Sequence, residues 1–191
     1  PYGAWFRSRL KLFTRLFLQN ESSKQLLFQF GITQTNVCGD TRIDRVRQIS
    51  LQPWEDALIN DFCGKGRVFV AGSIWEQDLP AIRTILQVLP PDWRIILVPH
   101  EPEEFPEAAV HEPCMYYSDG QLPVTPPRVM IVDTMGLLSR LYRKASMAYI
   151  GGGYGRGIHN LLEAVVYEIP VFMGPNHTRF QEANDLLHAG V

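Results

Sequence analysis

Apolar positions near the start of the chain recur three and four residues apart, which is the spacing of one helical face. This pattern predicts a helix over residues 5–17, whose apolar members are Phe6, Leu10, Phe13 and Phe17. A second helix is predicted within 19–32, because Asn20 or Ser22 can cap its start and Gly31 can end it. Both predictions concern a segment that precedes a change of pattern further along the chain.

A short strand followed by a Gly-Asp-Thr turn is predicted at 35–46, as in a connection between domains. From residue 67 onward, short continuous apolar runs are separated by helical stripes. Strands are predicted in "RVFVAGS", "WRIILVP", "RVMIVDT", "MAYIGG" and "PVFMGP", and helices over 81–89, 136–145, 158–168 and 178–190. Such alternation is typical of an α/β fold with a parallel sheet covered on both faces.

Polar or glycine-rich segments follow four of the predicted strands. Because a parallel sheet binds ligands beyond the carboxyl ends of its strands, we expect these segments to line one rim. They are Gly72-Ser73, Pro99-His100, 133–136 and 151–157. Taken singly, each has an alternative: Gly72-Ser73 could be an anion site or an ordinary helix cap, His100 a ligand contact or a structural residue, and 133–136 a capping box or a base-contacting loop.

Composition narrows the class of protein. The chain has 191 residues, a formal net charge of −2 and 46% hydrophobic residues, which suits a soluble domain with part of a second and disfavours a general nucleic-acid binder. Its three cysteines form no CxxC pair and its histidines no HxxxH or HExxH pattern, so we expect no metal and a reducing compartment. No apolar run approaches the roughly 20 residues of a membrane span. The chain opens at Pro1 without a methionine, and we expect it to be a piece of a longer protein.

The stretch "GGGYGRGIHNLLEA", residues 151–164, carries the strongest chemical signal, with five glycines in its first seven positions. It does not complete a GxGxxG pattern. It is not a phosphate-binding P-loop either, because Ile158 stands where that motif requires lysine. The stretch therefore does not predict a dinucleotide or triphosphate site.

In the predicted helix after the glycines, His159, Asn160 and Glu163 lie off the apolar face. We expect the first two in the first helical turn, where free backbone N–H groups and the helix dipole favour an anion. Glu163 lies one turn further along, and its carboxylate can accept hydrogen bonds from a ribose. These positions predict a nucleotide with a single phosphate at the helix start. The alternative is a sharp turn with polar residues facing water.

Several segments together resemble a known family. "GDTRIDRV", "VAGSIWEQD", "VPHEPEEF", "VDTMGLLSRLYRKASMAYIGGG" and "GIHNLLEAVVYEIPVFMGPNHTRFQEA" are similar in order and spacing to the 3-deoxy-D-manno-octulosonic acid (Kdo) transferases of lipopolysaccharide synthesis, in a Bacteroidetes-like form. The resemblance implies a Rossmann-like, doubly wound parallel sheet that is the C-terminal half of a glycosyltransferase B enzyme. It implies that 1–38 ends the N-terminal acceptor domain, that 39–52 connects the domains and that 53–191 binds the donor.

The resemblance also implies an activity. The whole enzyme would be an inverting, metal-independent transferase without a cofactor, moving Kdo from CMP-Kdo to a lipid A precursor at the cytoplasmic face of the bacterial inner membrane. It would be held there peripherally or by an N-terminal anchor. The family's catalytic base is a glutamate of the N-terminal domain, so we expect no catalytic base in this chain and no activity from it alone.

Donor-binding positions carry over from the resemblance residue by residue. Gly72 and Ser73 would face the phosphate or sugar, and Glu163 the ribose. The cytidine would lie among Pro99, His100, Met135 and Gly136, and the phosphate region would include Gly152, Gly153, His159 and Asn160. The sequence departs from the commoner family pattern at two places, namely Leu137 after Gly136 and Ile74-Trp75-Glu76 after Ser73.

Two other classes of function stay open from the residues alone. A UDP-sugar glycosyltransferase or epimerase would also place glycines ahead of a helix with a ribose-binding glutamate. A non-catalytic nucleotide-binding module is the second alternative. For the helix over 5–17, we expect packing against the N-terminal domain, and its basic and aromatic residues leave contact with a membrane surface as the alternative.

Overall fold

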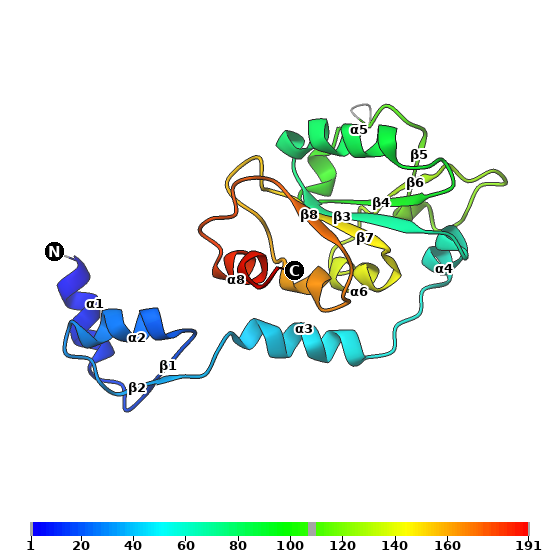
Figure 1. Ribbon diagram of the computed structural model, residues 1–191. Helices are drawn as coiled ribbons and strands as arrows, with labels where there is room; N and C mark the ends of the chain where they lie inside the picture. The colour runs from blue at the N-terminus through cyan, green and yellow to red at the C-terminus, as the bar shows by residue number, and fades with distance from the viewer. Residues whose placement is uncertain (1, 107–109, 191) are drawn as a thin grey trace. The chain divides into compact units, whose positions relative to one another are not determined.

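A computed structural model describes residues 2–106 and 110–190 of the chain. The chain divides into two compact units, Pro1–Arg45 and Val46–Val191, which are shown in Figure 1. The division falls inside the segment 39–52, which the family resemblance assigns to a connection between domains. The assignment of the first unit to an acceptor domain stays a prediction.

The N-terminal unit pairs two helices with two short strands. Its elements are α1 (Tyr2–Leu10), β1 (Leu16–Leu18), α2 (Glu21–Phe28) and β2 (Thr35–Val37). The prediction of a helix over 5–17 is wrong beyond Leu10, because 16–18 form a strand that pairs in parallel with β2. The spacing of apolar residues could not reveal this partner, which lies 19 positions along the chain in register. The predicted cap of the second helix is confirmed, since the Asn20 side chain accepts a hydrogen bond from the Ser23 N–H at 2.9 Å.

Two helices lead into the C-terminal unit, and neither is predicted from the sequence. They are α3 (Thr41–Leu51) and α4 (Ala57–Cys63). The Arg143 guanidinium donates to the carbonyls of Ser50 and Gln52 at 2.9 and 2.7 Å, which satisfies carbonyl groups at the end of α3. Asp56 caps α4 by accepting from the Ile59 N–H at 3.0 Å.

A six-stranded parallel sheet forms the centre of the C-terminal unit, in the order β5-β6-β4-β3-β7-β8. Its strands are β3 (Val68–Ile74), β4 (Arg94–Pro99), β5 (Cys114–Tyr116), β6 (Val129–Ile131), β7 (Met147–Ile150) and β8 (Val171–Met173). The five predicted strands are confirmed. Strand β5 was not predicted, because it is a short edge strand within a proline-rich stretch and is held in place by pairing with β6.

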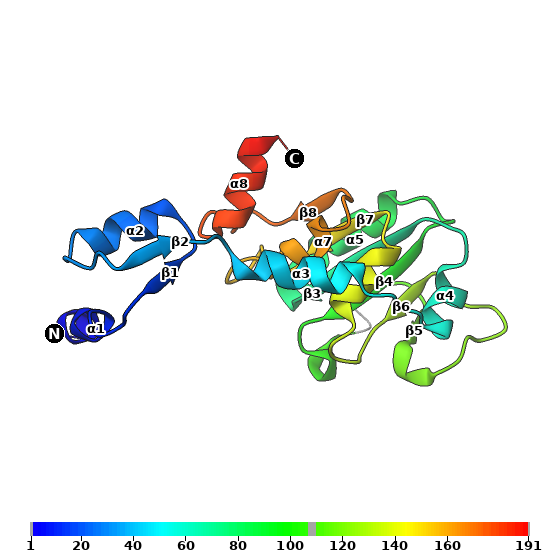
Figure 2. The same ribbon diagram turned by 90° about the horizontal axis from the view of Figure 1, so that it is seen from below.

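Apolar side chains bury both faces of this sheet. Along β3, Val68 and Val70 belong to one core cluster, and Phe69 and Ala71 to the other. Helix α5 (Leu79–Val88) covers the Phe69 face, while α4, α6 (Leu138–Leu141), α7 (Leu162–Val165) and α8 (Gln181–Ala189) contribute to the other core. Figure 1 shows α5 on one side of the sheet and α6 and α8 on the other, and Figure 2 views the unit from this second side. The predicted α/β class and two-sided burial are confirmed.

The strand order changes direction at β3. The chain passes from β3 to β4 on one side and returns later to β7 on the other side, so the loops after β3 and β7 diverge from adjacent strand ends. In doubly wound sheets a ligand binds in the crevice at such a switch point. The fold therefore places Gly72-Ser73 and 151–157 at the position where a ligand site is expected.

Candidate functional site

Segments after β3, β4 and β6 line one small cavity at the carboxyl edge of the sheet. Its volume is about 80 Å³. Five of the predicted site residues contribute to it, namely Ser73, Pro99, His100, Met135 and Gly136. The prediction that these separate loops converge on one rim is thereby confirmed, while their contacts with a ligand stay predictions.

A larger cavity of about 460 Å³ lies along the same rim. We call it the Trp75–Arg156 cavity. Of the predicted site residues it includes His159, and its lining is Trp75, Gln77, Glu101, Gly155, Arg156, Gly157 and His159. Trp75 and His100 stack face to face with ring centroids 4.3 Å apart, so the two cavities share an aromatic wall.

The loop needs glycines, which have no side chains, because the chain's own backbone fills the space around it. A Cβ atom at Gly151 would lie 2.2 Å from the Ser73 carbonyl oxygen, and one at Gly153 would lie 2.5 Å from the backbone nitrogen of Gly174. Gly152 has a φ of +88°, which favours glycine, and a Cβ there would lie 2.3 Å from the Gly157 carbonyl oxygen. The glycines thus allow the ends of β3, β7 and β8 to meet at backbone contact.

Gly72 serves internal packing in the same way. A Cβ atom at this position would lie 2.0 Å from the Tyr142 hydroxyl and 2.6 Å from a methyl group of Leu138. The next residue, Ser73, lies at a β-bulge with a φ of +51°, an unusual conformation for a residue with a side chain. Of this pair, Ser73 is the residue that lines the small cavity.

The predicted helix over 158–168 is much shorter in the structure. Helix α7 covers only Leu162–Val165, so His159 and Asn160 precede it and do not lie in its first turn. The His159 N–H donates to the Gly151 carbonyl at 3.2 Å, and the Gly152 N–H donates to Asp78 at 2.8 Å. The prediction that His159 and Asn160 lie in the first turn of a helix is therefore wrong, while an anion near them stays a prediction. The N–H groups of His159 and Gly152 are used within the fold.

Asp78 joins the loops after β3 and β7. It is 0% exposed. Its carboxylate accepts hydrogen bonds from the Trp75 N–H, the Gly152 N–H and the Tyr149 hydroxyl, at 2.9, 2.8 and 2.8 Å. Burial, followed by the bond to Asp78, raises the pKa of Tyr149, which therefore stays a proton donor. Asp78 was not predicted as a site residue, although the Trp-x-x-Asp spacing after a strand has the form of a capping box.

Trp75, His100 and His159 form a stacked cluster on the rim. Trp75 and His159 lie side by side with nearly parallel rings, their centroids 6.2 Å apart, and His100 stacks over both with centroids 4.3 and 4.4 Å away. The Trp75 indole N–H donates to Nε2 of His159 at 2.8 Å. Burial lowers the pKa of His159, His100 lowers it further, and Asp78 acts in the opposite direction. The arrangement favours a neutral imidazole at position 159.

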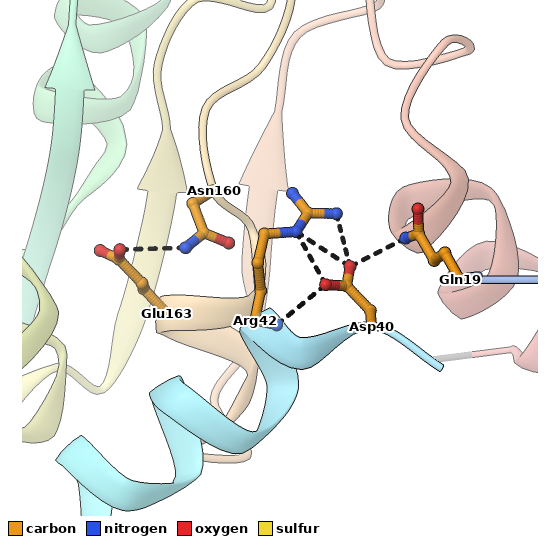
Figure 3. A network of polar contacts seen from close by, with 5 residues as sticks. All are labelled: Gln19, Asp40, Arg42, Asn160 and Glu163. Carbon is orange, nitrogen blue, oxygen red and sulfur yellow. Dashed lines mark hydrogen bonds and ion pairs between the residues drawn. The ribbon is translucent and has the colours of Figure 1, made fainter. Parts of the chain in front are cut away.

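Asn160 and Glu163 form the polar pair drawn in Figure 3, where the Asn160 amide donates to a carboxylate oxygen of Glu163 at 3.0 Å. Burial raises the pKa of Glu163, and the bond from Asn160 partly opposes this shift. The Asn160 carbonyl oxygen is buried without a hydrogen-bond partner among the described residues. Such an atom is satisfied by a ligand that donates hydrogen bonds, as ribose hydroxyls do.

Figure 3 also draws a polar network that belongs to the N-terminal unit. Arg42 makes ion-pair contacts with Asp40 at 2.6 Å, and the Gln19 amide donates to the same carboxylate at 2.9 Å. The hydrogen bond from Arg42 holds the pKa of Asp40 below its usual value. This network orders the Gly-Asp-Thr turn around Asp40.

Metal-ligating side chains do not gather in threes anywhere within 2–106 and 110–190. Within the same residues, every helix is too short or too polar to cross a membrane. Several rim residues were not predicted as site residues. They are Trp75, Gln77, Glu101 and Arg156, whose place on the rim depends on the paths of the loops after β3, β4 and β7.

Comparison with known proteins finds relatives that share one name. The chain is 25% identical over 186 residues to "3-deoxy-D-manno-octulosonic acid transferase" of Rickettsia felis, a match that covers 92% of the chain and 39% of the relative. It is 29% identical over 191 residues to the protein of the same name from Chlamydia pneumoniae, covering 91% of the chain and 42% of that relative. The chain is a homologue of proteins named Kdo transferase. It spans about two fifths of their length.

Two further comparisons bear on fold and function. A crystal structure described as the C-terminal CMP-Kdo binding domain of WaaA from Acinetobacter baumannii shares the fold, with a TM-score of 0.55, 22% identity and 76% of each chain covered. This likeness to a C-terminal domain confirms the predicted fold class. A bifunctional glycosyltransferase/methyltransferase of Fusobacterium nucleatum is 27% identical over 183 residues, covering 88% of the chain and 28% of that protein. No family model matches the chain.

Proposed function

We propose that this chain is the donor-binding part of a glycosyltransferase that moves Kdo from CMP-Kdo to a lipid A precursor in lipopolysaccharide synthesis. One observation carries the proposal: the half-buried Asn160–Glu163 pair directly follows His159, which lies on a rim built by four strand-end loops, in a homologue of the Kdo transferases. The orphaned Asn160 carbonyl oxygen and the acceptor oxygens of Glu163 suit the hydroxyl groups of a ribose.

The nucleotide parts are assigned to the rim as follows. The base lies in the small cavity with Pro99, His100 and Met135, where His100 offers a stacking surface. The ribose hydroxyls donate hydrogen bonds to the carboxylate of Glu163, which the Asn160 amide orients. Ser73 lines the small cavity, and its hydroxyl donates a hydrogen bond to the phosphate. Gly152 supports this arrangement through Asp78 and does not bind the phosphate with its N–H.

The proposed reaction is an inverting transfer that needs no metal. An acceptor hydroxyl attacks the anomeric carbon while CMP leaves, and a carboxylate removes the proton of that hydroxyl. A CMP leaving group carries one phosphate, whose charge a few fixed donors can stabilise. The carboxylate that acts as catalytic base belongs to an N-terminal domain outside this chain. The chain alone therefore binds the donor and does not catalyse the transfer.

A calorimetric titration of the chain with CMP and with UDP tests the proposal. We expect saturable binding of CMP and a clear preference for CMP over UDP. Glu163→Gln is expected to weaken CMP binding by about tenfold, because a charge-assisted hydrogen bond to the ribose is lost. Glu168→Gln, at an exposed position just beyond α7, is the matched control and is expected to bind like the wild type.

Preference for UDP would contradict the proposal and favour a UDP-sugar enzyme. Asn160→Ala, introduced into the full-length protein, tests for a non-catalytic module. If transferase activity is retained in full, the nucleotide-binding role of the pair is wrong. A loss of activity with normal expression supports it.

We also propose that the whole protein works at the cytoplasmic face of the inner membrane, where its lipid acceptor is made. The N-terminal unit exposes Trp5, Phe6 and Phe17, and the adjacent Arg7 and Arg9 carry positive charge. Such a combination binds anionic lipid surfaces. Co-sedimentation of the chain with vesicles containing phosphatidylglycerol tests this location, with Phe17→Ser expected to reduce binding. Binding at the level of neutral vesicles would contradict it.

A further inference from the structure

The Trp75–Arg156 cavity has no part of the nucleotide assigned to it. Its volume of about 460 Å³ lies within the roughly 300–1,000 Å³ of small-molecule sites. It borders the base-binding cavity through the Trp75–His100 stack. A group attached to the nucleotide can therefore enter it without leaving the rim.

Arg156 supplies the positive charge of this cavity. Its side chain is exposed, and within the described residues its guanidinium has neither an ion pair nor a hydrogen bond. Its backbone carbonyl accepts from Arg179 at 3.1 Å, which anchors the loop and leaves the side chain free. A guanidinium of this kind binds a carboxylate through two parallel hydrogen bonds.

His159 supplies a second donor, because Trp75 fixes its tautomer. An indole N–H can only donate, so Nε2 of His159 must accept at 2.8 Å and the ring proton must be on Nδ1. Stacking against His100 holds the plane of the ring. Nδ1 is not buried, and it bonds to no other group in the described part of the chain. The Nδ1–H is thus a fixed donor in a residue that lines the cavity.

The remaining polar lining has the opposite character. Glu101 accepts hydrogen bonds, and the Gln77 amide both donates and accepts. A carboxylate such as Glu101 repels a phosphate group but accepts hydrogen bonds well from hydroxyl groups. A lining with one cation, one imidazole donor and one carboxylate therefore matches a ligand that carries a single acid group among several hydroxyls.

We propose that the Trp75–Arg156 cavity is the subsite for the sugar acid of the donor, with its carboxylate on Arg156 and His159 Nδ1–H and its hydroxyls towards Glu101 and Gln77. The inference rests on the proposed function, in which the transferred sugar is an acid. It assigns Trp75 as a positioning residue that acts through His159.

Titration of the chain with free Kdo and with its methyl ester, followed by NMR with ¹⁵N-labelled histidine, tests the subsite. We expect the acid to bind at least about tenfold more tightly than the ester and to shift the Nδ1 resonance of His159. Arg156→Gln is expected to remove most of this discrimination. Arg140→Gln, which removes an exposed charge in α6 away from both cavities, is expected to retain it.

Trp75→Phe keeps a stacking ring and removes the indole donor. We expect it to redistribute the His159 proton between the two ring nitrogens, visible in the ¹⁵N spectrum, and to reduce the discrimination several-fold. Equal binding of acid and ester by the wild type, or undiminished discrimination by Arg156→Gln, would overturn the inference.

A parallel CMP titration separates this inference from the proposed function. CMP lacks the sugar acid, so wild type and Arg156→Gln are expected to bind it equally. If CMP binds but the acid is not preferred, the subsite is wrong and the nucleotide site stands. If the acid is preferred but CMP does not bind, the nucleotide assignment is wrong and the subsite stands.

Discussion

The glycine loop and the aromatic cluster stand at neighbouring strand ends and contribute to the rim in opposite ways. In 151–153 the backbone packs so tightly that a methyl group would overlap another part of the chain. In Trp75, His100 and His159 the side chains themselves line the cavities. A dense run of glycines therefore builds the support here, and side chains from other loops offer the chemistry.

The largest expected effect comes from filling the glycine loop. Gly153→Ala places a methyl group against the backbone of Gly174, which cannot move without shifting β8, and we expect a loss of at least about 3 kcal/mol in the free energy of unfolding. Gly155→Ala is the matched control, because its nearest neighbour would be 3.6 Å away, and it should change stability by less than about 1 kcal/mol. Urea unfolding measures both. Similar stability of the two variants would disprove the close-packing explanation.

The next effect concerns the residue that joins the two regions. Asp78→Ala leaves the Gly152 N–H, the Trp75 N–H and the Tyr149 hydroxyl without their acceptor, and we expect a loss of about 2–3 kcal/mol. Asp92→Ala, at an exposed position, is expected to change stability little. The measurement is again urea unfolding, combined with CMP affinity for the folded protein. Unchanged stability in Asp78→Ala would show that these bonds contribute nothing.

A gain in stability is expected when the proposed ligand-binding carboxylate, Glu163, is replaced by an amide. Burial raises the folded-state pKa of Glu163 above its ordinary 4.5, so the folded state binds the proton more tightly and loses stability as the pH rises through the folded pKa. Glu163→Gln removes this cost and keeps an acceptor for Asn160. We expect about 0.5–1 kcal/mol of stabilisation at neutral pH and none well below pH 4.5.

Thermal unfolding of Glu163→Gln and of the Glu168→Gln control at both pH values checks this expectation. A less stable Glu163→Gln at neutral pH would show that the carboxylate supports the fold. In that case a loss of CMP binding in this variant could no longer be assigned to the ligand contact.

The smallest expected effect is the pH dependence that His159 introduces. The unfolded imidazole titrates near 6.5, while burial and then His100 lower the pKa of the folded one. As the pH falls below about 6.5, the unfolded state binds a proton more readily than the folded state does, so the free energy of unfolding decreases. His159→Gln should lose part of this decrease between about pH 7.5 and about pH 5.5, and solvent screening of the half-buried ring keeps the effect small. His188→Gln, at an exposed position in α8, should retain it.

Parts of the fold could be predicted because their signal is local. Five of the six strands of the sheet are short apolar runs bounded by polar or glycine residues, and helix α5 shows a regular apolar stripe. The elements that were missed depend on partners far along the chain. Strand β5 exists through its pairing with β6, and β1 replaces a predicted helix because β2 satisfies its backbone groups.

The site shows the same division. The sequence alone determined an α/β chain with a parallel sheet, predicted that Ser73, Pro99, His100, Met135 and Gly136 lie on one rim, and placed Asn160 and Glu163 off the apolar face of their segment. The tertiary structure decided that the glycines serve backbone packing, that Asp78 ties two loops together and that Trp75 meets His159 across 84 positions of chain. Close approach and burial are properties of the folded chain, because they depend on which distant segments fill the space around a residue.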